Sequence, residues 1–274
     1  MTSYRLKLVA VITMLIDHLA KILVNQRLLF LLNPDVDLSS TLWIVSLSNL
    51  MEWVGRIAFP LFAFMIAEGC SKTRSMPKYV GRLSLFSIVS QPFYYIAFSA
   101  ERRVFSVENI LGGLRSLCTL HIDNIFVILA LGALSIWIFR SLSERGRGRL
   151  KWLIVPILGL LCLAVEMRHV AYGAFGILLI FFLSIDERHS YRVTVMVIWL
   201  TVFYLGYNVY WSYSWLFSDH IIWSYLWTWL FSLAAALLIF FYNGKRGSQS
   251  KWAFYAFYPA HLIAICALKT AIIP

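Results

Sequence analysis

The sequence is poor in charge and in cysteine, and each shortage excludes a class of protein. Only 14% of its 274 residues are charged, whereas 61% are hydrophobic. A soluble domain carries about a quarter of its residues as charged side chains, so water is the wrong solvent for this chain. The four cysteines, Cys70, Cys118, Cys162 and Cys266, are far apart and form no CxxC pair. They predict neither a metal site nor a disulfide framework.

Acidic residues are also scarce, with 13 Asp and Glu against 24 Lys and Arg, a net charge of +11. Such a balance is common in nucleic-acid-binding proteins. Here, however, the basic residues form short clusters between apolar runs, which is the pattern that orients a membrane protein. We therefore expect membrane lipids and no nucleic acid as partners. No internal repeat and no long polar segment divides the chain, so residues 1–274 are expected to form a single domain.

Long apolar runs predict how the chain crosses the membrane. In lipid every backbone polar group must be paired, which leaves helices or a closed barrel, and barrel strands alternate apolar and polar residues. The runs Ile125–Phe139 and Ala234–Phe241 do not alternate. The sequence thus predicts an all-α, polytopic membrane helix bundle. About nine spans are expected, near 6–24, 50–70, 82–99, 119–140, 152–166, 171–185, 192–209, 221–242 and 252–271.

The basic residues predict the orientation of these spans. With the N-terminus in the cytosol, most Lys and Arg residues fall on the cytosolic side, as the positive-inside rule requires. They are Arg5, Lys7, Lys72, Arg74, Lys78, Arg82, Arg140, Arg145, Arg147, Arg149, Lys151, Arg188, Arg192, Lys245, Arg246 and Lys251. The pair 152–166 and 171–185 is short, and either two thin spans or a re-entrant hairpin fits it. Trp211–Trp229 is typical of an aromatic belt at the outer interface.

The first helix carries the most unusual polar residues, because ionisable groups within a span cost several kcal/mol and are functional candidates. It contains Lys7, Asp17, His18 and Lys21. Lys7 and His18 are eleven residues apart, so they lie on one helix face, with His18 about 18 Å from the cytosolic end. Asp17 is expected to pair with Lys21 at i+4, or with a group on another helix. For His18 alone, a structural interhelical hydrogen bond is an equal alternative.

Other predicted helices carry polar residues at similar depth. Glu52 and Arg56 are an i,i+4 pair in the favourable order, and Pro60 removes one backbone hydrogen bond just beyond them. Glu68, nearer the cytosolic end, is placed to meet Lys7. The last helix offers Tyr258 and His261, with His261 about 13.5 Å from the cytosolic face. The fourth contributes His121, Asp123 and Asn124. Together these groups favour a functional centre over separate structural hydrogen bonds.

At these residues the sequence resembles the TraX family, membrane proteins implicated in acetylating the N-terminus of F-type pilin. The resemblance runs through Leu6–His18 (LKLVAVITMLIDH), Val54–Gly69 (VGRIAFPLFAFMIAEG), Tyr172–Ile180 (YGAFGILLI) and Lys251–Leu262 (KWAFYAFYPAHL). Asn124–Leu134 resembles a further family segment but has Val127 and Ile128 where a polar threonine is expected nearby. The stretches follow the family order from one end of the chain to the other.

A wider resemblance concerns Lys7 and His18. Transmembrane acyltransferases of the acyltransferase-three type carry a basic residue, ten residues and then a catalytic histidine, and this chain has that spacing. The resemblance implies acetyl-CoA as the donor and no metal. A basic residue at the cytosolic rim can also hold a CoA phosphate while the pantetheine arm extends inward to the histidine. The residues expected around the donor are Lys7, Glu68, Lys72, Arg74, Lys78, Arg82 and Asn124.

In this hypothesis His18 is the general base for the acceptor, or else the carrier of a covalent acetyl group. Arg56 would stabilise the oxyanion, oriented by Asp17 or Glu52. Tyr258 and His261 would position the acceptor or protonate the leaving thiolate.

The resemblance implies a multi-pass protein of the bacterial cytoplasmic (inner) membrane that acetylates a protein, namely the N-terminus of a pilin subunit. An O-acetyltransferase acting on a cell-surface glycan or lipid is the runner-up, because the residues do not distinguish an amine from a hydroxyl acceptor. A proton-coupled transporter is the alternative from another class, since buried Asp, His and Arg also form proton relays. A homodimer is compatible with each of these functions.

Overall fold

The computed structural model describes residues 1–25, 38–99, 105–119, 123–145, 149–168, 170, 172–208, 219–247 and 251–272. Within these residues all regular structure is helical. The elements are α1 (Ser3–Leu19), η1 (Ala20–Val24), α3 (Leu38–Gly55), α4 (Ala58–Lys72), α5 (Met76–Phe98), α6 (Val107–Cys118), α7 (Ile125–Arg145), η2 (Leu150–Leu153), α8 (Ile154–Met167), α9 (Gly173–Leu183), α10 (His189–Thr201), η3 (Val202–Asn208), α12 (Asp219–Phe240) and α13 (Lys251–Ile272). The all-helical prediction is confirmed for this part of the chain.

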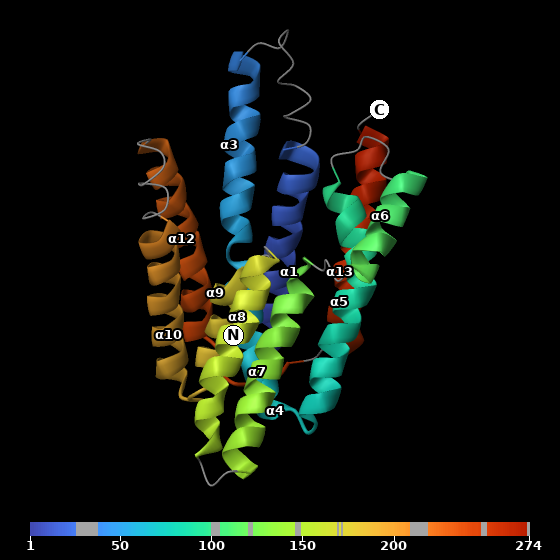
Figure 1. The fold of residues 1–274 in the computed structure, drawn as a ribbon. Coiled ribbons are helices and arrows are strands. Elements are labelled where there is room, and N and C mark those ends of the chain that lie inside the picture. Colours follow the sequence, from blue (N-terminus) through green and yellow to red (C-terminus); the bar gives the residue numbers. More distant parts are fainter. Residues whose placement is uncertain are drawn as a thin grey trace.

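The helices run roughly along one common direction (Figure 1). Helices α10 and α12 pack together on one side of the bundle, and α5, α6 and α13 lie on the other, with α1 between them. The last helix, α13, returns to the beginning of the chain and contacts α1. We call the end of the bundle where α4 passes into α5 the basic end, because Lys72, Arg74 and Lys78 lie there.

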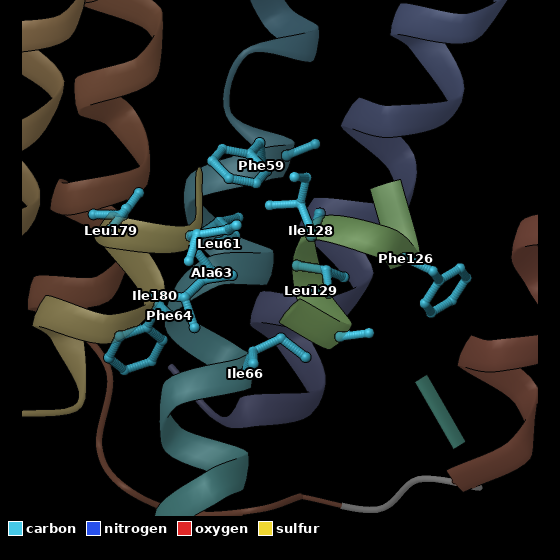
Figure 2. Packing of buried hydrophobic residues seen from close by; sticks show 14 of the residues in the cluster. Phe59, Leu61, Ala63, Phe64, Ile66, Phe126, Ile128, Leu129, Leu179 and Ile180 are labelled. Atoms are coloured by element: carbon cyan, nitrogen blue, oxygen red, sulfur yellow. The ribbon is translucent and has the colours of Figure 1, made fainter. Parts of the chain in front are cut away.

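Helices α4, α7 and α9 form the centre of the apolar core (Figure 2). Leu61, Ile128 and Ile180, one from each helix, are fully buried. Glycines allow this close approach. A Cβ atom on Gly132 would overlap Ile180, and one on Gly176 would overlap Ile128. The sequence Tyr172–Ile180 is therefore built to let α9 lie directly against α4 and α7.

The span predicted over 50–70 differs most from the structure. It begins earlier, at Leu38, and it consists of two helices, α3 and α4, separated by Arg56 and Ile57. Pro60 does not cause a bend within a continuous helix, because it lies in the first turn of α4, where its missing N–H needs no partner. A Cβ on Gly55 would overlap Asp17. The break therefore lies where α3 comes into direct contact with α1.

Other boundaries also differ from the predictions. Helix α5 begins at Met76, six residues before the expected start at 82. Helix α6 (Val107–Cys118) was not expected at all. The first and seventh predicted spans change from α-helix to π-helix at their ends, in η1 and η3. Arg192, expected in a connection, lies within α10 and is 4% exposed.

Five helical stretches among the described residues are long and apolar enough to cross a membrane. They are Leu42–Lys72, Ile125–Glu144, Leu150–Met167, Trp223–Phe240 and Trp252–Ala271. The chain is thus a multi-pass membrane protein. The predicted pair 152–166 and 171–185 appears as the long stretch Leu150–Met167 followed by the short apolar helix Gly173–Leu183. The number of nine crossings and the cytosolic N-terminus stay predictions.

Part of the predicted outer interface and of the polar set, including Trp211, Trp215 and His121, lies outside the described residues. Within the aromatic stretch that is described, Trp223 and Trp227 are exposed. The ring of Trp227 lies nearly parallel to that of Trp53, with 5.6 Å between their centroids.

Candidate functional site

Two histidines from opposite ends of the chain meet inside the bundle. His18 near the end of α1 and His261 in α13 are 8% and 5% exposed. The Nδ1 atom of His18 lies 2.7 Å from Nε2 of His261, and the ring planes differ by 5°. Two ring faces cannot approach to 2.7 Å, so the nitrogens meet edge to edge, as a hydrogen bond requires. The site therefore contains a directly coupled histidine pair.

The surroundings of His261 decide which nitrogen carries each proton. Its Nδ1 atom lies 2.9 Å from the backbone oxygen of Phe257. A carbonyl oxygen only accepts, so this Nδ1 must be protonated. In neutral His261 the Nε2 atom is then an acceptor, and the Nδ1–H group of His18 donates to it. This leaves a lone pair on Nε2 of His18, to which no described residue donates a hydrogen bond.

Asp17, the neighbour of His18, is also buried. Its Oδ2 atom accepts a 2.6 Å hydrogen bond from Nζ of Lys21, so the expected i,i+4 pair is formed. Its Oδ1 atom is buried and has no partner among the described residues. A buried carboxylate oxygen without a partner is costly, and this one lies against Gly55 of α3.

His18, Asp17 and Lys21 line a cavity of about 320 Å³, the histidine cavity. Asp123, just before α7, and Tyr94 of α5 also line it. Both are groups that can hydrogen-bond to a ligand. The cavity thus brings a histidine together with carboxylate and phenol groups.

Tyr172 lines the histidine cavity too and was not among the predicted site residues. It precedes α9 and has φ 64°, a left-handed conformation that is uncommon for a bulky residue. Such strain is concentrated at functional sites. Its ring stacks on Phe59 at a centroid distance of 3.8 Å. The sequence signal was its place before Gly173, which also has positive φ and where a Cβ would overlap Glu166.

A second, larger cavity of about 960 Å³ lies toward the basic end of the bundle. We call it the basic cavity, because five cations predicted to surround a donor line it. These are Lys7, Lys72, Arg74, Lys78 and Arg82, joined by Arg246, which the sequence analysis did not single out. Aromatic residues line it as well, and Nζ of Lys7 lies 5.3 Å from the ring centre of Phe254. Cations and aromatic rings together suit a ligand with phosphates and a flat ring.

Glu68 also lines the basic cavity, where it is held by several partners. It forms ion pairs with Lys72, at 2.5 Å, and with the buried Arg192 of α10. Tyr242 donates a 3.1 Å hydrogen bond to the same carboxylate. The arginine donates in addition to the backbone oxygen of Leu183. Glu68 therefore connects α4 to α10 and to the chain after α12, and its predicted role beside the donor stays a prediction.

Four predicted site residues lie outside the described lining of both cavities, namely Glu52, Arg56, Asn124 and His261, which reaches the histidine cavity only through its bond to His18. Glu52 and Arg56 form the expected i,i+4 pair at 3.7 Å, beside Asp17 rather than in the histidine cavity. Asn124 is fully buried. Its side-chain oxygen accepts from the backbone N–H of Phe126 and so caps α7, while its amide nitrogen donates to Gln91. Their predicted roles toward a ligand stay predictions.

Fold and site together define a multi-pass membrane protein with a histidine pair beside a cavity lined by basic residues. Residues 3–269 match the family described as TraX protein. The chain belongs to this family, as the resemblance predicted. A relative in Dichelobacter nodosus, a probable fimbrial assembly protein FimC of serogroup H1, is 28% identical over 281 residues. The match covers 98% of this chain and 96% of that protein. No solved structure matches the chain.

Proposed function

We propose that this protein is a membrane-embedded acetyltransferase that moves an acetyl group from acetyl-CoA to an amine acceptor. One observation carries the proposal. His18, whose Nε2 atom receives no hydrogen bond from a described residue, lines a cavity that shares four lining residues with a second cavity rich in cations. Acyl transfer from CoA needs a base near the thioester and cations that bind the CoA phosphates, and the two cavities provide one each.

The cations of the basic cavity and the length of the pantetheine arm determine where the donor would bind. The phosphates of acetyl-CoA bind the cations of the basic cavity, among them Lys7, Lys78 and Arg82. The pantetheine arm then extends along α1 toward His18, three helical turns deeper than Lys7. In the proposed orientation the basic end faces the cytosol, where acetyl-CoA is made available, within the bacterial inner membrane.

The chemistry requires a base and a path for one proton. The amine nitrogen of the acceptor attacks the thioester carbonyl carbon, and Nε2 of His18 takes a proton from that nitrogen. The new C–N bond forms, the C–S bond breaks, and the proton on His18 passes to the leaving sulfur, which gives an amide and free CoA. His261 holds His18 in the required tautomer and stabilises its positive charge, as the orienting member of a catalytic triad does.

The groups around His18 favour an amine over a hydroxyl acceptor. Two acceptor atoms are unoccupied by described residues: His18 Nε2 and Asp17 Oδ1. An amine brings at least two N–H donors and satisfies both, whereas a hydroxyl brings one. The family is associated with acetylation of F-type pilin, and the Dichelobacter relative is named for fimbrial assembly. We therefore propose the N-terminal amine of a pilin subunit as the acceptor. Membrane lipids are proposed to surround the helix bundle itself.

Binding of the donor provides the first test. The purified protein in detergent is heated with acetyl-CoA, with desulfo-CoA and without ligand, and its unfolding temperature is measured. Saturable stabilisation by both is expected, because both carry the phosphates. Incubation with a pilin subunit and acetyl-CoA should then add the mass of one acetyl group to the pilin N-terminus. Folded protein that is not stabilised by either ligand would favour the transporter instead.

A further inference from the structure

The basic cavity and the histidine cavity share a wall made of one residue from each of four helices. Met14 of α1, Phe62 of α4, Ile125 of α7 and Tyr258 of α13 line both cavities. We call these four residues the junction ring. Met14 lies one turn before His18 on α1, on the same helix face. The ring therefore separates the reacting histidine from the cavity that would hold the body of the donor.

Along α4 and α7, too, the ring residue is followed toward the basic end by residues that line only the basic cavity. On α4, Ala58 lines the histidine cavity and Ile66 lines the basic cavity, each one turn from Phe62. On α7, Leu129 lines the basic cavity one turn beyond Ile125. The four ring residues thus lie between the residues that line only the histidine cavity and those that line only the basic cavity.

Two residues of the ring are buried, and Phe62 and Ile125 are partly buried. Met14 and Tyr258 are 7% and 2% exposed. The Tyr258 hydroxyl is hydrogen-bonded to the backbone of Ile125, and its ring packs edge-on against Phe126 with 5.2 Å between centroids. Both contacts fix the tyrosine against α7. A ligand that is one methylene longer meets side chains held by such contacts, and they can move aside only by giving up part of their packing.

The distance from the ring to His18 places the reacting carbonyl. One turn of helix is about 5.4 Å. The attacking nitrogen needs about 3 Å to the base and about 3–3.5 Å to the carbonyl carbon, so base and carbonyl carbon are about one turn apart. The thioester carbonyl then lies within the junction ring, and the acyl carbons beyond it pack against ring side chains.

From this geometry we propose that the junction ring selects the acyl group by its length, so that acetyl is admitted and propionyl and butyryl are excluded. The inference rests on the proposed function, because it needs acyl-CoA in the basic cavity. One methylene too many in an apolar pocket typically lowers the preference for a ligand by a factor of about 10 to 200. Shortening Met14 or Phe62 would remove this discrimination by opening space beside the acyl group.

The test is a comparison of dissociation constants for CoA, acetyl-CoA, propionyl-CoA and butyryl-CoA, measured by titration calorimetry in detergent. The wild-type protein should bind butyryl-CoA at least about tenfold more weakly than acetyl-CoA. In Phe62→Ala and Met14→Ala this ratio should fall close to one. Phe62→Leu, a milder change, should give an intermediate ratio and guards against a variant that fails to fold.

Phe254→Ala and Met65→Ala are matched controls, because both residues line the basic cavity but not the histidine cavity. They should weaken all four ligands alike and leave the ratio at the wild-type value. Equal affinities of the wild-type protein for acetyl-CoA and butyryl-CoA would overturn the proposal. The proposal would also fail if folded Phe62→Ala and Met14→Ala proteins kept the wild-type ratio of the two dissociation constants. Folded wild-type protein that binds none of the four ligands would overturn the proposed function together with this inference.

Discussion

The Nδ1 atom of His18 and the Nε2 atom of His261 lie 2.7 Å apart, although 243 residues separate them in the sequence. The contact joins α1 to α13. Because the other nitrogen of His261 donates to Phe257, the pair has one arrangement of protons that leaves Nε2 of His18 ready to accept. This relationship makes His261 a positioning residue with a distinct mutational signature.

Replacing His261 should separate orientation of the base from binding of the donor. We expect His261→Phe to lower kcat by on the order of 10²-fold with little change in KM for acetyl-CoA. His261→Gln should recover part of the loss, because its amide oxygen can accept from His18 Nδ1–H. Steady-state kinetics of pilin acetylation give kcat and KM for each variant. Equal losses in the two variants would argue against the tautomer role.

Loss of His18 should remove chemistry and leave the donor site intact. His18→Ala is expected to lower turnover by about 10²- to 10⁴-fold, while acetyl-CoA still raises the unfolding temperature as it does for the wild-type protein. The measurement pairs an acetylation assay with thermal unfolding. A protein that turns over normally without this imidazole would exclude His18 as the base.

Lys7 should act on the donor and not on the chemical step. Lys7→Ala is expected to raise KM for acetyl-CoA by about tenfold, the equivalent of one lost charge-assisted contact of about 1.4 kcal/mol, with kcat nearly unchanged. The matched control is Lys151→Ala, since Lys151 is exposed and is absent from the described lining of the basic cavity. A fall in kcat at constant KM would show that Lys7 has a structural role instead.

The Glu68–Arg192 pair should matter for stability more than for selectivity. Glu68→Leu leaves the buried arginine without its counter-charge, and such losses cost about 3–5 kcal/mol. A large drop in unfolding temperature in detergent is expected. The double variant Glu68→Leu/Arg192→Met should recover much of it, because no charge is then left unpaired. A double variant less stable than either single one would contradict this account.

Gly55 and Gly159 offer a matched pair in two apolar helices. A Cβ at position 55 would overlap Asp17, whereas nothing lies within 4 Å of a Cβ at position 159. Gly55→Ala should lower the unfolding temperature and impair transfer, because Asp17 must move. Gly159→Ala should be neutral or slightly stabilising, as is usual for glycine to alanine in a helix. Similar effects of the two changes would refute the close contact between α3 and α1.

Local sequence rules found the helices and the pairs along them. The runs of apolar residues located most of the spans, and the i,i+4 spacing identified both the Asp17–Lys21 and the Glu52–Arg56 pairs. Helix α6 was missed because it is short and carries Glu108 and Arg115, so its composition does not resemble a span. The break at Arg56 was missed because it depends on how α3 meets α1.

Contacts between distant helices could not be predicted in the same way. The polar residues of α1 and α13 indicated a shared centre, yet the sequence alone did not show that His18 and His261 are bonded directly. Arg192 was counted with the loops because Glu68, its partner, lies 124 residues away. The left-handed backbone of Tyr172 is uncommon for a bulky residue, so local propensity did not predict it.

The junction ring has an electrical consequence as well. Its four side chains carry no charge, whereas both cavities beside it are lined by ionisable residues, so the ring is an uncharged layer between them. Moving one elementary charge through a membrane potential of 100 mV takes about 2.3 kcal/mol. An acetyl group is neutral and crosses this layer without electrical work, whereas an ion would meet both the field and an apolar wall.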